Sequence, residues 1–151
     1  MIAPASEPLT ARLVDGLYTE AMLLADEARS YFDDCARADR LELDPLTRVA
    51  FSCEALKVTT RLMHIVAWLL TRRAVEAGEI APDAPAGGGR RLGRAAATDG
   101  ANVAHFPETA RTLIAASCDL YARVERLEQG RGSDGGTGPA RALYNRLERS
   151  L

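Results

Sequence analysis

The sequence predicts an all-α protein, a three-helix bundle with a long central helix. Ala and Leu are abundant and aromatic residues make up only 5% of the 151 residues, which favours helix over strand. Apolar residues recur at helical spacing in three long segments, and none of the chain shows the alternation typical of a strand. A chain of this length suits one domain with one core.

The first helix is expected to run from about Leu9 to about Ala38, after a loose N-terminus over residues 1–8. Its apolar residues fall within one broad stripe, and charged residues lie on the other side. The stripe consists of Leu9, Leu13, Leu17, Ala21, Leu24, Ala28, Tyr31 and Cys35. Such a stripe indicates that one face of the helix packs on the rest of the bundle.

The second helix begins at a clear local signal. Asp44 is a residue type that caps free amides, and Pro45 suits the first helical position. Gly78 is a suitable stop, so we expect the helix to run from Pro45 to about Ala77. These roughly 33 residues would span about 50 Å. The short connection before Pro45 favours antiparallel packing on the first helix.

The rest of the chain is expected to alternate between flexible and helical parts. Gly and Pro interrupt the pattern over residues 79–105, which we expect to be a flexible inter-helix segment in which RLG is a helical turn or a docking loop. A third helix with one narrow apolar face is expected from Pro107 to about Gln129. The bundle domain therefore spans residues 9–129. Residues 130–151 are expected to be a linker and a short helical tail.

Residues 56–73, LKVTTRLMHIVAWLLTRR, form the central part of the second helix. Their uncharged run is about half the roughly 20 residues that a membrane span needs. On a helical wheel the apolar residues cover more than half of the circumference, which indicates packing on two sides: against the other helices and against a second copy of the chain. We therefore expect a homodimer. The apolar arc consists of Leu56, Thr59, Leu62, Met63, Ile65, Val66, Leu69 and Leu70.

The remaining side of this helix carries a polar strip. It consists of Lys57, Arg61, His64, Trp68 and Arg72. Either Trp68 covers a helix junction while the Arg side chains reach water, or the strip contacts a partner, since Trp and Arg are frequent in binding hot spots. We expect charge reversal at Arg61 and Arg72 to weaken partner binding without unfolding the protein. The full set of hypothetical partner-binding residues is Lys57, Arg61, His64, Trp68 and Arg72 together with Leu143, Tyr144 and Leu147 of the tail.

No catalytic apparatus is recognisable in the sequence. His64 and His105 are the only histidines, and neither belongs to a di-iron or zinc pattern. GGGRRLG lacks the GK[ST] ending of a phosphate-binding loop. No Ser/His/Asp or Cys/His set has a recognisable spacing. We therefore expect no catalytic, cofactor-binding or metal-binding residues, no cofactor, and a protein that is not an enzyme.

Composition also limits the compartment and the partners. Cys35, Cys53 and Cys118 are scattered without a CxxC motif, as expected for packed thiols in a reducing cytoplasm. The N-terminal residues lack the regions of a signal peptide. The net charge of −2 argues against a nucleic-acid partner. We expect a cytoplasmic protein that binds neither nucleic acid nor membrane.

Four segments of the chain resemble the alphaproteobacterial RcdA family, the regulators of CtrA degradation: YTEAMLLADEARSYFD, ALKVTTRLMHIVAWLLTRRAVEAGE, RRLG and LIAASCDLYARVERL. The resemblance extends over about residues 17–128, and TTRLMHIVAWLL is its most specific part. It implies a dimeric three-helix bundle that acts as an adaptor, without chemistry of its own. Such adaptors deliver cell-cycle regulators as cargo to the ClpXP protease, together with a response-regulator partner.

The resemblance implies no particular binding residues. A different function also remains open, that of a dimeric helical sensor that binds a small apolar ligand, because the apolar arc of the second helix is wide.

Overall fold

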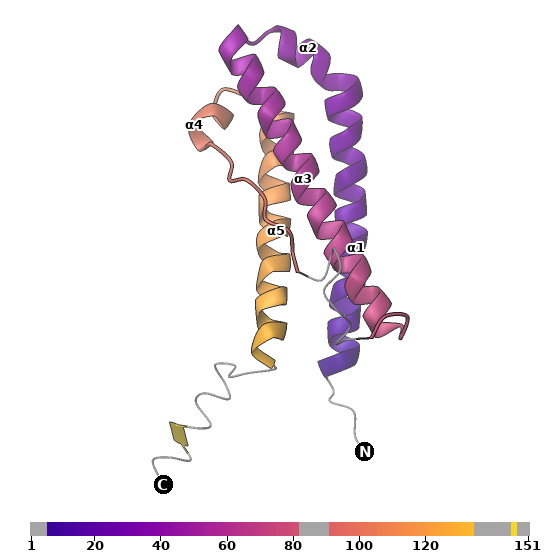
Figure 1. The fold of residues 1–151 in the computed structure, drawn as a ribbon. Helices are drawn as coiled ribbons and strands as arrows, with labels where there is room; N and C mark the ends of the chain where they lie inside the picture. Colours follow the sequence, from indigo (N-terminus) through magenta and orange to yellow (C-terminus); the bar gives the residue numbers. More distant parts are fainter. Residues whose placement is uncertain (1–5, 82–90, 135–145, 148–151) are drawn as a thin grey trace.

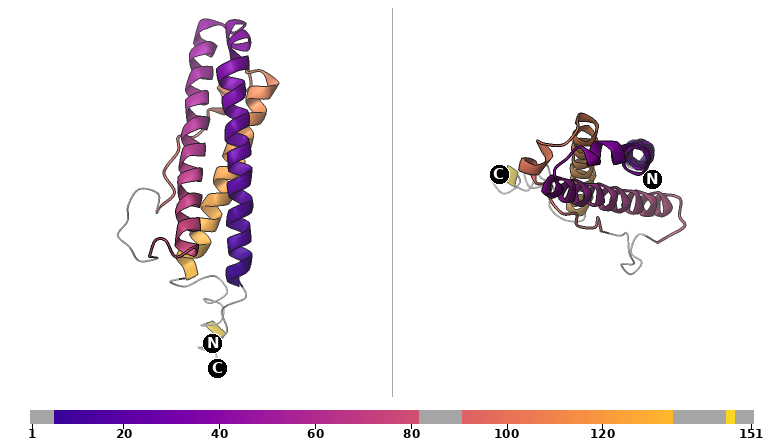
Figure 2. Two further views of the ribbon diagram at one scale, coloured as in Figure 1. Left: turned by 90° about the vertical axis from the view of Figure 1, so that its right-hand side faces the viewer. Right: turned by 90° about the horizontal axis from the view of Figure 1, so that it is seen from above.

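A computed structural model describes residues 6–81, 91–134 and 146–147 of the chain. The elements in order are α1 (Ser6–Ser30), the π-helix η1 (Tyr31–Cys35), α2 (Ala36–Leu41), α3 (Pro45–Glu76), α4 (Gly100–Val103) and α5 (Glu108–Asp134). The long helices α1, α3 and α5 lie side by side as an elongated bundle (Figures 1 and 2). This arrangement confirms the predicted all-α fold and its long central helix.

The first predicted helix is interrupted by η1. A π-helical turn holds more residues than an α-helical turn, so it changes which side of the helix the following residues face. Tyr31 in η1 and Ala36 in α2 are both buried. The Tyr31 hydroxyl donates to Asp39 Oδ2 over 2.7 Å. The predicted stripe is correct from Leu17 to Tyr31, whereas Leu9, Leu13 and Cys35 at its two ends are exposed.

Local signals set both ends of α3 where the sequence predicted them. Asp44 Oδ1 accepts from the Thr47 backbone N–H over 3.0 Å, and Oδ2 accepts from the Thr47 hydroxyl over 2.8 Å. These two hydrogen bonds lower the pKa of Asp44. At the other end Gly78 has a φ of 76°, which lets the Glu79 N–H donate to the Ala74 carbonyl over 2.9 Å.

The core lies between the three long helices. The narrow face predicted for the third helix is buried or half-buried on α5, and it consists of Ala110, Leu113, Ile114, Ser117, Leu120, Tyr121, Val124 and Leu127. The rings of Phe32, Phe51 and Phe106 form an edge-to-face chain at one end of the core, with centroid distances of 5.7 and 5.2 Å. On the surface, Arg123 of α5 pairs with Glu20 of α1. Contacts therefore join each long helix to both of the others.

Residues 91–99, which we call the strap, run along α3 and α5 without regular structure and lead into α4 (Figure 1). This part of the predicted flexible segment is a docking loop, one of the two structures expected for RLG. Residues 82–90, with most of the expected loose N-terminus and tail, lie outside the described residues. Within the described ranges no helix is long and apolar enough to cross a membrane.

Candidate functional site

The strap covers the polar strip of α3. Lys57 Nζ donates to the Ala97 carbonyl over 2.9 Å. Arg61 Nη2 donates to the Ala96 carbonyl over 2.9 Å and to the Thr98 hydroxyl over 2.6 Å. Arg61 is only 3% exposed and Trp68 only 1%. In this conformation the strip therefore contacts the chain itself. Arg61 does not reach water, and the contact with a partner stays a prediction.

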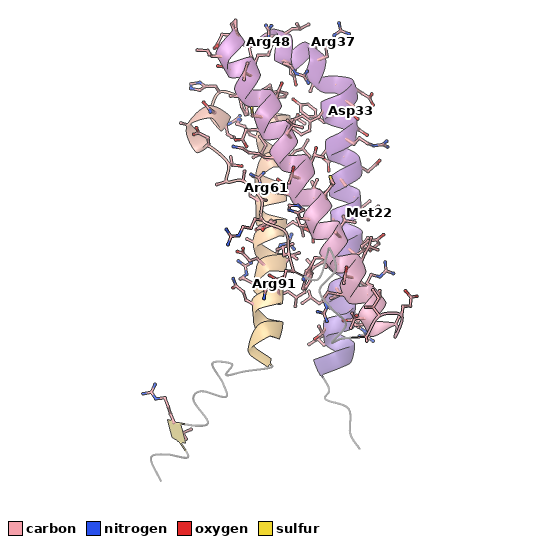
Figure 3. The ribbon with its side chains drawn as sticks, viewed as in Figure 1. Met22, Asp33, Arg37, Arg48, Arg61 and Arg91 are labelled. Carbon is pink, nitrogen blue, oxygen red and sulfur yellow. The ribbon has the colours of Figure 1, made fainter. Side chains whose placement is uncertain are left out.

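Arg61 lies on the side of α3 that faces α5 (Figure 3). Its Nη1 atom donates to the Ser117 hydroxyl over 3.3 Å, and that hydroxyl donates to the Ile114 carbonyl over 2.8 Å. All of the hydrogen-bond acceptors of Arg61 are neutral, and no carboxylate pairs with it in the described part of the chain. A buried guanidinium with neutral acceptors keeps a positive charge that is only partly compensated.

Glu54 is the acidic residue of this site. It is buried, and its Oε1 atom accepts from Lys57 Nζ over 2.8 Å and from the Asp99 backbone N–H over 3.2 Å. Lys57 therefore neutralises Glu54 and also holds the strap through Ala97.

The other end of the strap is held by α5. The Tyr121 hydroxyl donates to the Gly93 carbonyl over 2.7 Å, and the Leu92 N–H donates to Glu128 Oε2 over 2.5 Å. Gly93 fits closely over His64, since an added Cβ atom would lie 2.7 Å from Cγ and Nδ1 of the ring. Only glycine therefore fits at this position without a shift of the strap or of the imidazole.

Two buried nitrogen atoms beneath the strap lack hydrogen-bond acceptors. Trp68 Nε1 and His64 Nδ1 have no partner among the residues that the structure describes. The guanidinium of Arg72 stacks over the Trp68 ring, with 5.9 Å between Cζ and the ring centroid. The strap thus covers this part of the strip without satisfying all of its polar atoms.

Sequence reasoning missed the residues that complete this site. They are Glu54, Thr98, Ser117, Tyr121 and Glu128. Glu54 and Glu128 are polar helix residues, which are expected to face solvent, so they gave no local signal. Ser117 and Tyr121 lie on the face predicted for the third helix, but the sequence did not indicate their hydrogen bonds to Arg61 and Gly93. The RRLG segment was the single indication that this part of the chain belongs to the site. Its glycine, Gly93, is the residue that packs on His64.

An adjacent side of α3, about 100° around the helix from the polar strip, carries an exposed row of mainly apolar residues, which we call the α3 seam. Its members are spaced alternately three and four residues apart: Leu46, Val49, Cys53, Leu56, Thr60, Met63, Ala67 and Leu70. Leu56 is 68% exposed and Met63 is 64% exposed. This is the spacing of a coiled-coil contact. The apolar arc predicted from the sequence is therefore packed on one flank and uncovered on the other.

An apolar groove of about 650 Å³ separates the seam from α1. Met22, Ala25 and Phe32 line one wall, and Met63, Val66 and Leu70 line the other. Arg29 and Asp33 add charged groups to the first wall. Met22 and Asp33 mark the position of this wall along α1 and η1 in Figure 3.

The remaining predicted site residues belong to the tail. Leu143 and Tyr144 lie outside the described residues, and Leu147 is exposed. Within the described ranges, no group of three or more His, Cys, Asp or Glu side chains is placed to hold a metal ion.

Comparisons with known proteins place the chain in a family. A family model described as "Protein of unknown function (DUF1465)" matches residues 5–151. None of the curated proteins matches the chain. The solved structure of RcdA from Caulobacter crescentus CB15 is 32% identical, covers 78% of this chain and 89% of its own, and superposes with a TM-score of 0.65. The chain therefore belongs to the RcdA family, as the resemblance of its sequence predicted.

Proposed function

We propose that this protein is a non-enzymatic adaptor in cell-cycle-controlled proteolysis, which tethers regulatory protein cargo to the ClpXP protease in the cytoplasm. The observation that carries the proposal is the kinship with RcdA, at 32% identity over 89% of that chain. Tethering raises the concentration of cargo near the protease, so modest affinity for each partner is enough. In this proposal a response-regulator partner acts together with the adaptor.

Two copies of the adaptor associate through the α3 seam in this proposal. The seam extends from Leu46 to Leu70, about 36 Å along the helix axis. Its positions repeat at the spacing by which two helices interlock their side chains. A two-fold dimer on this row covers the exposed apolar side chains of both copies. The seam lies about 100° around α3 from the strip that the strap covers, so the seam contact does not itself use the strap.

The tail and the polar strip are the proposed contacts for other proteins. The sequence spacing of Leu143, Tyr144 and Leu147 is typical of one side of a short amphipathic helix. Such a segment is too short to be stable alone and gains stability when it binds a partner. The exposure of Leu147 supports a role in binding.

The proposal is tested first in the protein's own host. A tagged full-length chain is cross-linked mildly, recovered and read by mass spectrometry. We expect enrichment of the ClpX unfoldase and a response regulator. The matched bait carries Leu143→Ala, Tyr144→Ala and Leu147→Ala, and it should recover less of one class of partner. Recovery of the chain alone, as a dimer, would contradict the adaptor function.

A reconstituted reaction then tests the function directly. Purified ClpXP degrades a cargo identified by the cross-linking, with and without the chain and the response regulator. We expect the chain to raise the degradation rate at low cargo concentration and to have little effect at saturating cargo, because tethering acts through local concentration. An unchanged rate at low cargo concentration would rule out tethering.

Kinship with RcdA favours the adaptor over the alternative of a sensor for a small apolar ligand. The groove between α1 and α3 has a suitable volume, but Met63, Ala67 and Leu70 of its wall belong to the seam. A thermal-shift screen of metabolites separates the two functions, since a ligand that binds only the native state raises the melting temperature.

A further inference from the structure

The strap is bound to the bundle mainly through its backbone. Side chains of α3 donate to the carbonyls of Ala96 and Ala97, and Tyr121 donates to the carbonyl of Gly93. The backbone N–H groups of Leu92 and Asp99 donate to carboxylates of the bundle. Proteins that bind extended peptides use the same kind of contact, in which main-chain hydrogen bonds provide affinity and a few side-chain positions provide specificity.

Apolar burial contributes little to the attachment of the strap. Arg91, Arg94, Ala96 and Ala97 are exposed, and Leu92 is only half-buried. The strap is therefore held mostly by hydrogen bonds, and water can form hydrogen bonds with the same groups when the segment opens. Segments with few buried apolar contacts open at lower free energy than the core does.

The surface beneath the strap is nevertheless built like a binding site. Arg61 is 3% exposed and has only neutral acceptors. Trp68 Nε1 and His64 Nδ1 are buried and have no hydrogen-bond acceptor within the described part of the chain. The strap therefore leaves a cation without a carboxylate and two donor-capable nitrogens without partners, and a ligand that supplied a carboxylate would suit this surface better.

We propose that the strap occupies the binding site for an extended peptide segment of a protein partner, and that this segment has glycine at the position of Gly93 and one acidic side chain. The glycine is required because an atom added at Gly93 would collide with His64. The acidic side chain takes the place of Thr98, whose hydroxyl lies 2.6 Å from Arg61 Nη2. When the strap opens, the partner's backbone accepts the hydrogen bonds from Lys57, Arg61 and Tyr121.

This inference rests on the proposed adaptor function for the identity of the partner, which would be cargo or a companion regulator. It assigns the contact residues expected from the sequence to a surface that becomes available only after the strap opens. Purified protein is enough to test it, so its outcome does not depend on the protease experiment.

The first step of the test opens the strap. Gly93→Val places side-chain atoms against His64, whereas the matched control Gly100→Ala adds an atom with nothing within 4 Å. Hydrogen exchange at the Leu92 and Asp99 amides should be faster in Gly93→Val than in the control and the wild type, while α3 and α5 stay protected. Unchanged protection of both amides would overturn the proposal that the strap is releasable.

A second variant covers the case in which Gly93→Val fails to fold. Tyr121→Phe with Glu128→Gln weakens the attachment of the strap to α5 without adding atoms. The Gly93 carbonyl loses its donor, and the Leu92 N–H faces a neutral acceptor instead of a carboxylate. The same exchange measurement applies to this double variant.

The second step measures peptide binding by fluorescence anisotropy. The labelled peptides are RLGRAAATD, which is the sequence of residues 91–99, and versions with Asp or Asn in place of Thr98. We expect the Asp peptide to bind the open variant about tenfold more tightly than the Asn peptide, because a charged acceptor strengthens the hydrogen bond from Arg61. Wild type should bind each peptide more weakly, by the fraction of molecules with an open strap.

Each other outcome overturns part of the proposal. No saturable binding to an open and folded variant would show that the surface is not a peptide site. Equal binding of the Asp and Asn peptides would remove the acidic side chain from the proposal. Formation of larger assemblies by the open variant, without peptide binding, would assign the site to the strap of a second copy.

Discussion

The guanidinium of Arg61 on α3 donates to the hydroxyl of Ser117 on α5 over 3.3 Å, and both side chains are almost completely buried. The same guanidinium holds the strap through Ala96 and Thr98. One side chain therefore joins two helices and a loop from the inside. This position changes the expectation that charge reversal at Arg61 would leave the fold intact, because a carboxylate there would be buried beside neutral acceptors.

Arg61→Ala should lower the free energy of unfolding by about 3 kcal/mol, because it removes buried aliphatic atoms and leaves three acceptors without their donor. Arg126→Ala, at an exposed position of α5, should change it by less than about 0.5 kcal/mol. Urea unfolding followed by circular dichroism measures both values. A loss for Arg61→Ala no larger than that of the control would show that the buried network contributes little.

Leu56→Glu and Met63→Glu should each convert the proposed dimer to a monomer, because both residues lie in the exposed seam and a carboxylate there would be buried at the contact. Light scattering coupled to size exclusion gives the mass of each protein. Thr112→Glu on the exposed side of α5 adds the same charge away from the seam and should leave the mass unchanged. A monomeric wild type at high concentration would exclude the seam as a stable interface.

The bounds of α3 and the apolar face of α5 were predictable because their causes are local. Asp44 and Gly78 act within one turn of their own positions, and helical spacing alone identifies a buried stripe. Which sides of α3 are buried and which are exposed could not be predicted in the same way. The Ala96 carbonyl and the Thr98 hydroxyl, 35 and 37 residues further along the chain, accept hydrogen bonds from Arg61, so a polar strip is buried and an apolar row is exposed. The π-helix η1 likewise left no signal in the spacing.

The Tyr31 hydroxyl provides a prediction about alkaline pH. Burial raises its pKa, and the hydrogen bond and charge of Asp39 raise it further. A tyrosine pKa that is higher in the folded state contributes stability that is fully present below the unfolded value of about 10 and is lost as the pH rises through the folded value.

Tyr31→Phe should therefore cost about 1 kcal/mol near neutral pH, where it removes the hydrogen bond to Asp39. The difference from wild type should shrink above about pH 10, where ionisation of Tyr31 in the unfolded state begins to destabilise the wild type. Urea midpoints measured from neutral to alkaline pH test this. A difference that stays constant over the whole range would show that Tyr31 is not the titrating group.

Replacing each of two glycines with alanine should change the stability of the protein in opposite directions. Gly78→Ala should destabilise the protein by about 1 kcal/mol, because a φ of 76° is strained for residues with a Cβ atom. Gly16→Ala, inside α1 with nothing within 4 Å of the new atom, should stabilise it by up to about 1 kcal/mol. Thermal melts of the two variants provide the comparison, and shifts of the same sign would contradict the conformational argument.

The seam and the polar strip lie on two adjacent sides of the same uninterrupted helix, α3, about 100° apart. One inserted or deleted residue rotates everything after it by about 100°, which would turn the second half of each surface away from the first. Relatives that keep both surfaces should therefore align from Pro45 to Glu76 without gaps. Differences in chain length within the family are expected to accumulate before and after this helix.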